Sequence, residues 1–85
     1  MKIVGNIQPF VMDSKLYVYD DGNCVEVKET DIDNINHNIF VLVDKYNIDQ
    51  VDLAGPQSFL KGIKDKFDLA QINKYDAKKV NMKLI

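Results

Sequence analysis

Few residues of this chain are able to do nucleophilic or zinc chemistry, and they lie far apart. There is one cysteine, Cys24, and one histidine, His37. A thiol nucleophile needs a base beside it and a structural zinc ion needs four ligands, so this pair supports neither. The periodicity of the surrounding helix turns His37 away from the apolar stripe. We therefore interpret Cys24 as a small residue on a sheet face and His37 as a surface side chain.

Carboxylates could instead hold the metal ions of a nuclease, which needs several of them from different elements. The nearest candidates are Asp13, Asp44 and Asp52. Asp13 falls in a predicted turn and Asp44 follows the buried positions of a helix, so both are interpreted as solvated acids. Asp52 alternates with apolar residues in a predicted interior strand, where a carboxylate needs a partner, and we predict a lysine. No catalytic residue, metal ligand or cofactor is predicted.

A weak signal for anion binding lies where a predicted strand ends at Gly55 and a helix begins. Backbone N–H groups at a helix start can hold a phosphate, and the residues available are Gly55, Gln57 and Ser58. The segment lacks the glycine fingerprint of dinucleotide sites and the Gly-Lys-Ser/Thr ending of phosphate loops, and Pro56 removes one donor. A small nucleotide- or phosphate-binding domain is therefore a second alternative, which equilibrium dialysis with nucleotides would test.

The elements that must position these residues begin with a hairpin. Asp21-Gly22 is typical of a type I′ turn, because both positions tolerate positive φ. The pairs predicted outward from this turn are Tyr19 with Cys24, Val18 with Val25, Tyr17 with Glu26 and Leu16 with Val27. This register gathers the aliphatic side chains on one face and the tyrosines on the other.

A first strand is predicted over residues 2–12, upstream of a turn at Asp13-Ser14. Gly5 often marks a bulge and Pro9 cannot donate to a ladder, so we expect this strand to be bent or split. The predicted neighbours across the turn are Val11 with Leu16 and Phe10 with Tyr17.

A helix follows over residues 32–46, where apolar residues recur at spacings of three and four. Thr30 and Asp33 approximate a capping box at its start, and Asn47 predicts a left-handed stop at its end. Residues 50–54 predict a short interior strand, since apolar residues alternate there between a helix and a Gly-Pro pair.

The second helix is predicted to begin at Gly55-Pro56, with proline in the first turn. Its apolar stripe consists of Phe59, Leu60, Ile63 and Phe67. Residues 69–75 either extend this helix or form a short strand. The alternation of Val80, Met82 and Leu84 with polar residues predicts a terminal strand.

The expected fold is therefore α/β (α+β), with the order strand, strand, strand, helix, strand, helix, strand in one domain, residues 1–85. We expect a mixed sheet with an antiparallel N-terminal meander and both helices packed mainly on one face. This order resembles the core of ribonuclease H-like folds, and the resemblance implies a metal-dependent phosphodiesterase. Such nucleases carry an aspartate in the middle of the first strand, whereas residues 3–8 contain no acid. The resemblance is one of topology, and a degenerate enzyme of this type is the main alternative function.

Composition limits the remaining function classes. The 85 residues are 46% hydrophobic and 28% charged, with a net charge of −2, which suffices for one small core. A lone cysteine cannot form an internal disulfide, which favours a reducing compartment. No apolar run reaches the roughly 18 residues of a membrane span, and Met1-Lys2-Ile3 begins no signal-peptide pattern. We therefore expect a cytoplasmic protein that does not enter a membrane.

All eleven basic residues are lysine. Because AT-rich codons favour Lys, Asn and Ile, an AT-rich bacterial or phage source is expected, and a source of high GC content would contradict it.

Without arginine the chain lacks the guanidinium group that recognises guanine and phosphate through two parallel hydrogen bonds. The lysines of residues 74–83 could contact a nucleic-acid backbone, but the net negative charge argues against it. Residues 1–54 carry ten acids and four lysines, and residues 55–85 carry three acids and seven lysines, so the two halves should attract each other.

The remaining feature is an aromatic cluster. If both helices cover the aliphatic face, the opposite face carries Val4, Phe10, Tyr17 and Tyr19 with little chain left to cover it. Tyrosine combines a large rigid contact area with a polar tip and is enriched in protein interfaces. We therefore expect a non-catalytic interaction module that binds a protein partner, or itself as a homodimer, through this face or through a strand edge.

Overall fold

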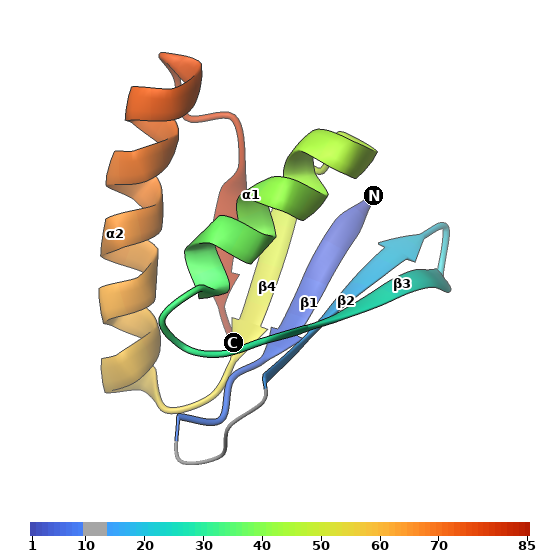
Figure 1. The fold of residues 1–85 in the computed structure, drawn as a ribbon, viewed down its shortest axis with the longest axis horizontal. Helices are drawn as coiled ribbons and strands as arrows, with labels where there is room; N and C mark the ends of the chain where they lie inside the picture. Colours follow the sequence, from blue (N-terminus) through green and yellow to red (C-terminus); the bar gives the residue numbers. More distant parts are fainter. Residues whose placement is uncertain (10–13) are drawn as a thin grey trace.

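The computed structural model describes residues 1–9 and 14–85 of the chain. A five-stranded sheet has two helices packed against it (Figure 1). The elements in chain order are β1 (Lys2–Asn6), β2 (Ser14–Asp20), β3 (Asn23–Thr30), α1 (Ile35–Tyr46), β4 (Gln50–Ala54), α2 (Gln57–Tyr75) and β5 (Asn81–Leu84). The predicted order of strands and helices is therefore confirmed.

β1 lies at the centre of the sheet, in the strand order β3-β2-β1-β4-β5. β2 runs antiparallel to β1 and to β3, whereas β4 is parallel to β1 and β5 is parallel to β4. Parallel neighbours need long crossovers, and α1 and α2 supply them before β4 and β5. The sheet is thus mixed, with the antiparallel meander at its N-terminal end, as predicted.

Both helices pack on the same face of the sheet. In β1, Ile3 and Gly5 are buried on that face, while Val4 between them is half-buried on the other. The dimensions of 31 × 29 × 20 Å fit one helix layer on one sheet layer. Between the layers lies one hydrophobic core, whose fully buried members include Ile3, Leu16, Ile39, Leu42, Leu53, Leu60 and Phe67.

The register of β1 against β2 differs from the predicted one. The observed pairs include Val4 with Tyr17 and Gly5 with Leu16, where the sequence predicts Phe10 with Tyr17 and Val11 with Leu16. Phe10 and Val11 lie outside the described residues, as does Asp13 of the predicted turn. The two registers differ by six residues, an even number, so both place the same side chains of β2 on the core face.

Gly5 explains why this register is favoured. A Cβ atom on Gly5 would lie 2.7 Å from Leu53 Cδ2 and 3.0 Å from Leu16 Cδ2. The glycine therefore makes room for two leucines from the neighbouring strands and does not mark a bulge, because the pairing of β1 is continuous from Lys2 to Asn6.

The β2–β3 hairpin begins as predicted and then changes register. Asp21 and Gly22 both have positive φ, at 52° and 83°, and Tyr19 pairs with Cys24. A bulge then leaves Val25 without a partner on β2. Beyond it the pairs are Val18 with Glu26, Tyr17 with Val27 and Leu16 with Lys28, one residue away from the predicted pairs.

The bulge reverses the two faces of β3, because side chains alternate along a strand. Val25 and Val27 are 46% and 50% exposed, so the prediction that they join the aliphatic core face is wrong. Glu26 takes the helix side instead, where Lys45 Nζ and Tyr46 Oη donate to its Oε1 over 2.6 and 2.5 Å. These two bonds from α1 give the carboxylate polar partners beside the core.

The start of α1 lies later than predicted, because β3 continues to Thr30. Thr30 Oγ1 accepts a hydrogen bond from Asn38 Nδ2 and donates one to Asp31 O, so the expected capping box with Asp33 is not formed. Asp31 Oδ1 accepts the N–H of Asn34, the residue before the helix. The predicted end is confirmed, since Asn47 adopts the left-handed conformation with φ 56°.

α2 follows Pro56 and runs without interruption to Tyr75, so residues 69–75 are helical. Gln71 in this stretch is fully buried, and its side-chain amide pairs with the backbone of Val80. Gln71 Nε2 donates to Val80 O over 3.0 Å, and Val80 N donates to Gln71 Oε1 over 2.9 Å. This clasp connects α2 to the start of β5.

Neither helix of the described part of the chain has the length and hydropathy needed to cross a membrane.

Candidate functional site

The face of the sheet turned away from both helices is called the open face here. Cross-strand pairing arranges its side chains in rows that run from β3 to β5. The middle row consists of Val27, Tyr17, Val4, Asp52 and Lys83. The rows on either side are Cys24, Tyr19, Lys2, Gln50 and Asn81, and Glu29, Lys15, Asn6 and Ala54. The face thus has an apolar half over β1–β3, where Val27, Tyr17, Val4 and Tyr19 are bordered by polar and charged side chains, and a polar half that extends from Lys2 over β4 and β5.

The apolar half contains three of the four predicted contact residues. Val4 lies directly opposite Tyr17, and Tyr19 stands two positions along the same strand as Tyr17. All three are half-buried by their neighbours on the sheet, and no element of the described chain packs over them from the helix layer. Phe10 lies outside the described residues. Val27, which the predicted register places on the other face, joins this half opposite Tyr17 and is 50% exposed.

The polar half contains one ion pair and two hydrogen bonds, centred on Asp52. Lys2 Nζ lies 3.6 Å from Asp52 Oδ2, so the predicted lysine partner is confirmed. Gln50 Nε2 donates to Asp52 Oδ1 over 2.7 Å, and Asn81 Nδ2 donates to Gln50 Oε1 over 3.2 Å. The side chain of Asp52 is 15% exposed, since these partners surround it. Polar side chains of β1, β4 and β5 thus contact one another across the sheet.

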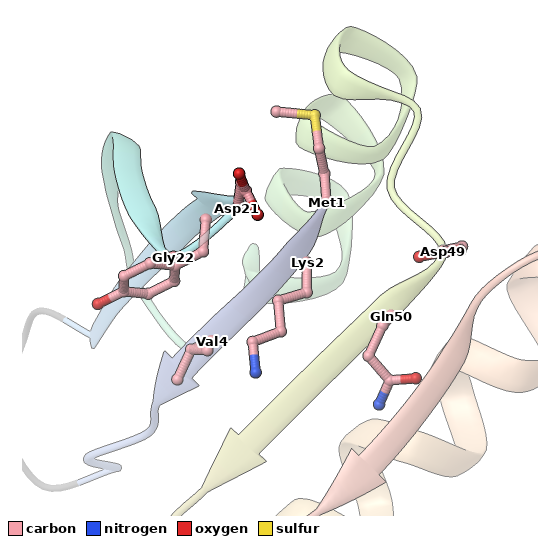
Figure 2. Close-up of a pocket in the computed structure, with 8 residues that line it drawn as sticks. Met1, Lys2, Val4, Asp21, Gly22, Asp49 and Gln50 are labelled. Carbon is pink, nitrogen blue, oxygen red and sulfur yellow. The ribbon is translucent and has the colours of Figure 1, made fainter.

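A hollow of about 590 Å³ lies at the N-terminal end of β1 and β4, where the two halves meet (Figure 2). In Figure 2 the side chains of Lys2 and Gln50 project from neighbouring strands, and Met1, Asp21 and Asp49 stand around the rim. The remaining lining residues are Val4, Tyr19 and Gly22. Its apolar and charged lining suits a side chain that has both an apolar stem and a polar end.

Sequence reasoning finds the tyrosines of this site but misses Lys2, Gln50, Asn81 and Val27. Lys2, Gln50 and Asn81 each begin a strand and alternate with buried residues, which is the signal that could place them on one face. Val27 could not be found in this way, because its face depends on the bulge.

The residues considered for catalysis are not brought together. Cys24 is exposed on β3 and His37 is exposed on α1. Within residues 1–9 and 14–85, no three acidic, histidine or cysteine side chains are grouped so that they could hold a metal ion. Asp13 lies outside this part of the chain.

Asp44 of α1 contacts two residues of α2. Its Oδ1 accepts the hydroxyl proton of Tyr75 over 2.6 Å, and its Oδ2 lies 3.1 Å from Lys74 Nζ. The Tyr75 bond, followed by the ion pair with Lys74, lowers the pKa of Asp44. Desolvation, together with this bond, raises the pKa of Tyr75 well above its usual range. The carboxylate therefore joins α1 to the C-terminal end of α2.

The predicted anion-binding segment contacts the chain's own backbone. Gly55 has φ +150°, and a Cβ there would lie 2.7 Å from Ile7 O, so glycine allows two backbone segments to approach closely. Gln57 Nε2 donates to Ile85 O over 3.0 Å. Ser58 is exposed at the start of α2. Gly55 and Gln57, two of the three residues predicted to bind a phosphate, thus contact the backbone of the chain itself.

Comparison with models of protein families, with curated proteins and with solved structures found no match. The surface chemistry of this chain is therefore the basis of the function proposed below.

Proposed function

We propose that this protein is a small, non-catalytic interaction module that binds another protein through its open face. One observation carries the proposal. Val27, Tyr17 and Val4 form an apolar row across three strands on the side of the sheet that neither helix covers. An antiparallel sheet can leave one face to water, but such a face is usually polar. A row of tyrosine and valine side chains there is the composition of an interface core.

The polar half of the open face supports the proposal, because charged and amide groups beside an apolar row can fix the orientation of a bound partner. Gln50 donates a hydrogen bond to Asp52 and Lys2 forms an ion pair with it, so a partner meets charged and amide groups beside the apolar row. Interfaces commonly place such a polar rim around an apolar centre. The hollow between the halves accepts one protruding side chain of the partner.

Capture by the purified protein tests this function. The wild-type chain, immobilised, retrieves its partner from a lysate of the source cell, and binding of the purified partner is then measured by calorimetry. The double variant Tyr17→Ser/Tyr19→Ser is expected to lose about 2 kcal/mol or more of binding free energy, because aromatic residues at an interface centre carry much of it.

The matched control is Phe59→Ser, which removes an aromatic side chain, 37% exposed, from α2 on the helix side of the molecule. This variant should bind the partner as the wild type does. Equal binding by the tyrosine variant and the wild type would exclude the open face as the contact surface.

A further inference from the structure

We infer that this chain forms a two-fold dimer in which β3 pairs antiparallel with β3 of a second copy, centred on Val27. Two five-stranded sheets would then form one continuous sheet. The inference goes beyond the proposed function, because it concerns backbone pairing at the edge of the sheet, although Val27 belongs to the open face as well. Different variants therefore test the two proposals.

The first support is that β3 is a long edge strand. It has one neighbour among the described strands, β2, and spans eight residues from Asn23 to Thr30. Figure 1 shows β3 along the outer side of the sheet, beyond β2. The free edge of a strand presents N–H and C=O groups that can pair with another chain. β5, at the opposite edge, has only four residues, so β3 offers the longer ladder.

The second support is the pattern of charge along β3, which favours a register centred on Val27. In a two-fold pair of strands, the residue at the centre lies opposite its own copy, and its neighbours lie opposite each other. Centres at Glu26, Lys28 or Glu29 would each set two like charges face to face, which is unfavourable. A centre at Val27 sets Glu26 opposite Lys28 of the second copy, and the symmetry repeats this pair. Opposite charges then face each other on both sides of a Val27–Val27 contact.

The third support is that Glu26 and Lys28 are available for these pairs. Lys45 and Tyr46 both donate to Oε1 of Glu26, so Oε2 can accept a further cation. Lys28 takes no part in any ion pair that the described residues form. The bulge places both residues on the helix side of β3. On the open face, the row of Val4, Tyr17 and Val27 would continue into the second copy, because Val27 lies at its end.

A charge exchange tests the register. Lys28→Glu alone should raise the dissociation constant of the dimer in sedimentation velocity by about tenfold or more, because both ion pairs become repulsive. Glu26→Lys alone should do the same. An equimolar mixture of the two variants should form a heterodimer as tight as the wild-type dimer, because glutamates then face lysines at both positions. Lys61→Glu makes the same change of charge on exposed α2 and should leave the dimer unchanged.

A cysteine pair provides a second measurement that does not depend on the fold tolerating Glu26→Lys. Residues directly opposite in antiparallel strands have Cα atoms about 4.5–5.5 Å apart, within the range of a disulfide. In a Cys24→Ser background, Val27→Cys should therefore crosslink two copies under mild oxidation at least about tenfold faster than Val25→Cys, whose copies would lie about 13 Å apart.

The outcomes separate this inference from the proposed function. Tyr17→Ser/Tyr19→Ser should still crosslink through Val27→Cys even where it no longer binds the partner. A wild-type chain that sediments as a monomer at about 1 mM would overturn the dimer. Equal crosslinking rates of Val25→Cys and Val27→Cys would overturn the register, as would a mixture of the charge variants that stays monomeric while both are folded.

Discussion

Glu26 accepts hydrogen bonds from the last turn of α1 and thereby ties that helix to the edge strand β3. The bond from Lys45, followed by that from Tyr46, holds the pKa of Glu26 below its ordinary value of 4.5. The same bonds raise the pKa of Lys45 and of Tyr46, because each loses a favourable partner on deprotonation. The connection between the two elements is therefore stronger when Glu26 is ionised.

Acid should therefore loosen this contact. The folded pKa of Glu26 lies below 4.5, so the unfolded chain binds more protons in the interval between the two values. The stabilisation is present above pH 4.5 and is lost as the pH falls through the lower, folded pKa. Urea midpoints measured from about pH 6 to pH 3 should fall less steeply for Glu26→Gln than for the wild type. Glu29→Gln removes a carboxylate from the same strand without touching either bond, and equal slopes for the two variants would contradict the assignment.

Three polar side-chain contacts join the elements of the fold in addition to the core. The Glu26 contact joins α1 to β3, the Asp44 contact joins α1 to α2, and the Gln71 clasp joins α2 to the approach of β5. The clasp is the most buried of the three, because Gln71 has no exposed surface and Val80 is 1% exposed. Its amide supplies both partners that the backbone of Val80 would otherwise lack in the interior.

Replacing Gln71 by a side chain of similar size should accordingly lower the free energy of unfolding substantially. Gln71→Leu leaves the buried N–H and C=O of Val80 without partners, and we expect unfolding to require about 2–4 kcal/mol less than in the wild type. Urea denaturation followed by circular dichroism measures this difference. Asn73→Leu makes a similar change at an exposed position of the same helix and should stay within about 0.5 kcal/mol of the wild type. A Gln71→Leu variant as stable as this control would exclude a stabilising clasp.

One hydrophobic core connects every described element except β3, which is joined to the rest by its pairing with β2 and by the bonds of Glu26 to α1. Side chains from both helices and from the central strands belong to a single buried cluster. The unequal charge of the two halves of the chain contributes less than the sequence suggests. Of the four ion pairs among the described residues, only that between Lys74 and Asp44 joins residues 1–54 to residues 55–85.

A single core predicts that the molecule unfolds as one unit. The chain has four tyrosines and no tryptophan, so tyrosine emission reports on Tyr17 and Tyr19 in the sheet and on Tyr46 and Tyr75 in the helices. Urea transitions followed by this emission and by far-ultraviolet circular dichroism should coincide. Two separate midpoints would show that the meander and the remaining elements unfold independently.

Local pattern in the sequence was sufficient for the order of elements, for the Asp21-Gly22 turn, for the end of α1 at Asn47 and for the placement of both helices on one face. Each of these depends on neighbouring residues, through side-chain periodicity or backbone preference, and needs no knowledge of distant contacts. The tyrosines of the open face follow from the same alternation. The lysine partner of Asp52 follows from the cost of burying a carboxylate alone.

Tertiary contacts decided the remaining features. Alternation repeats every two residues, so it cannot distinguish registers that differ by six, whereas the leucines packed over Gly5 favour the observed one. The bulge at Val25 turns Glu26 toward α1 and Val27 toward the open face, because bonds from Lys45 and Tyr46 stabilise the carboxylate there. Residues 69–75 are helical where the amide of Gln71 meets the backbone of Val80. Each of these choices depends on partners distant in the chain, whose positions a local pattern does not contain.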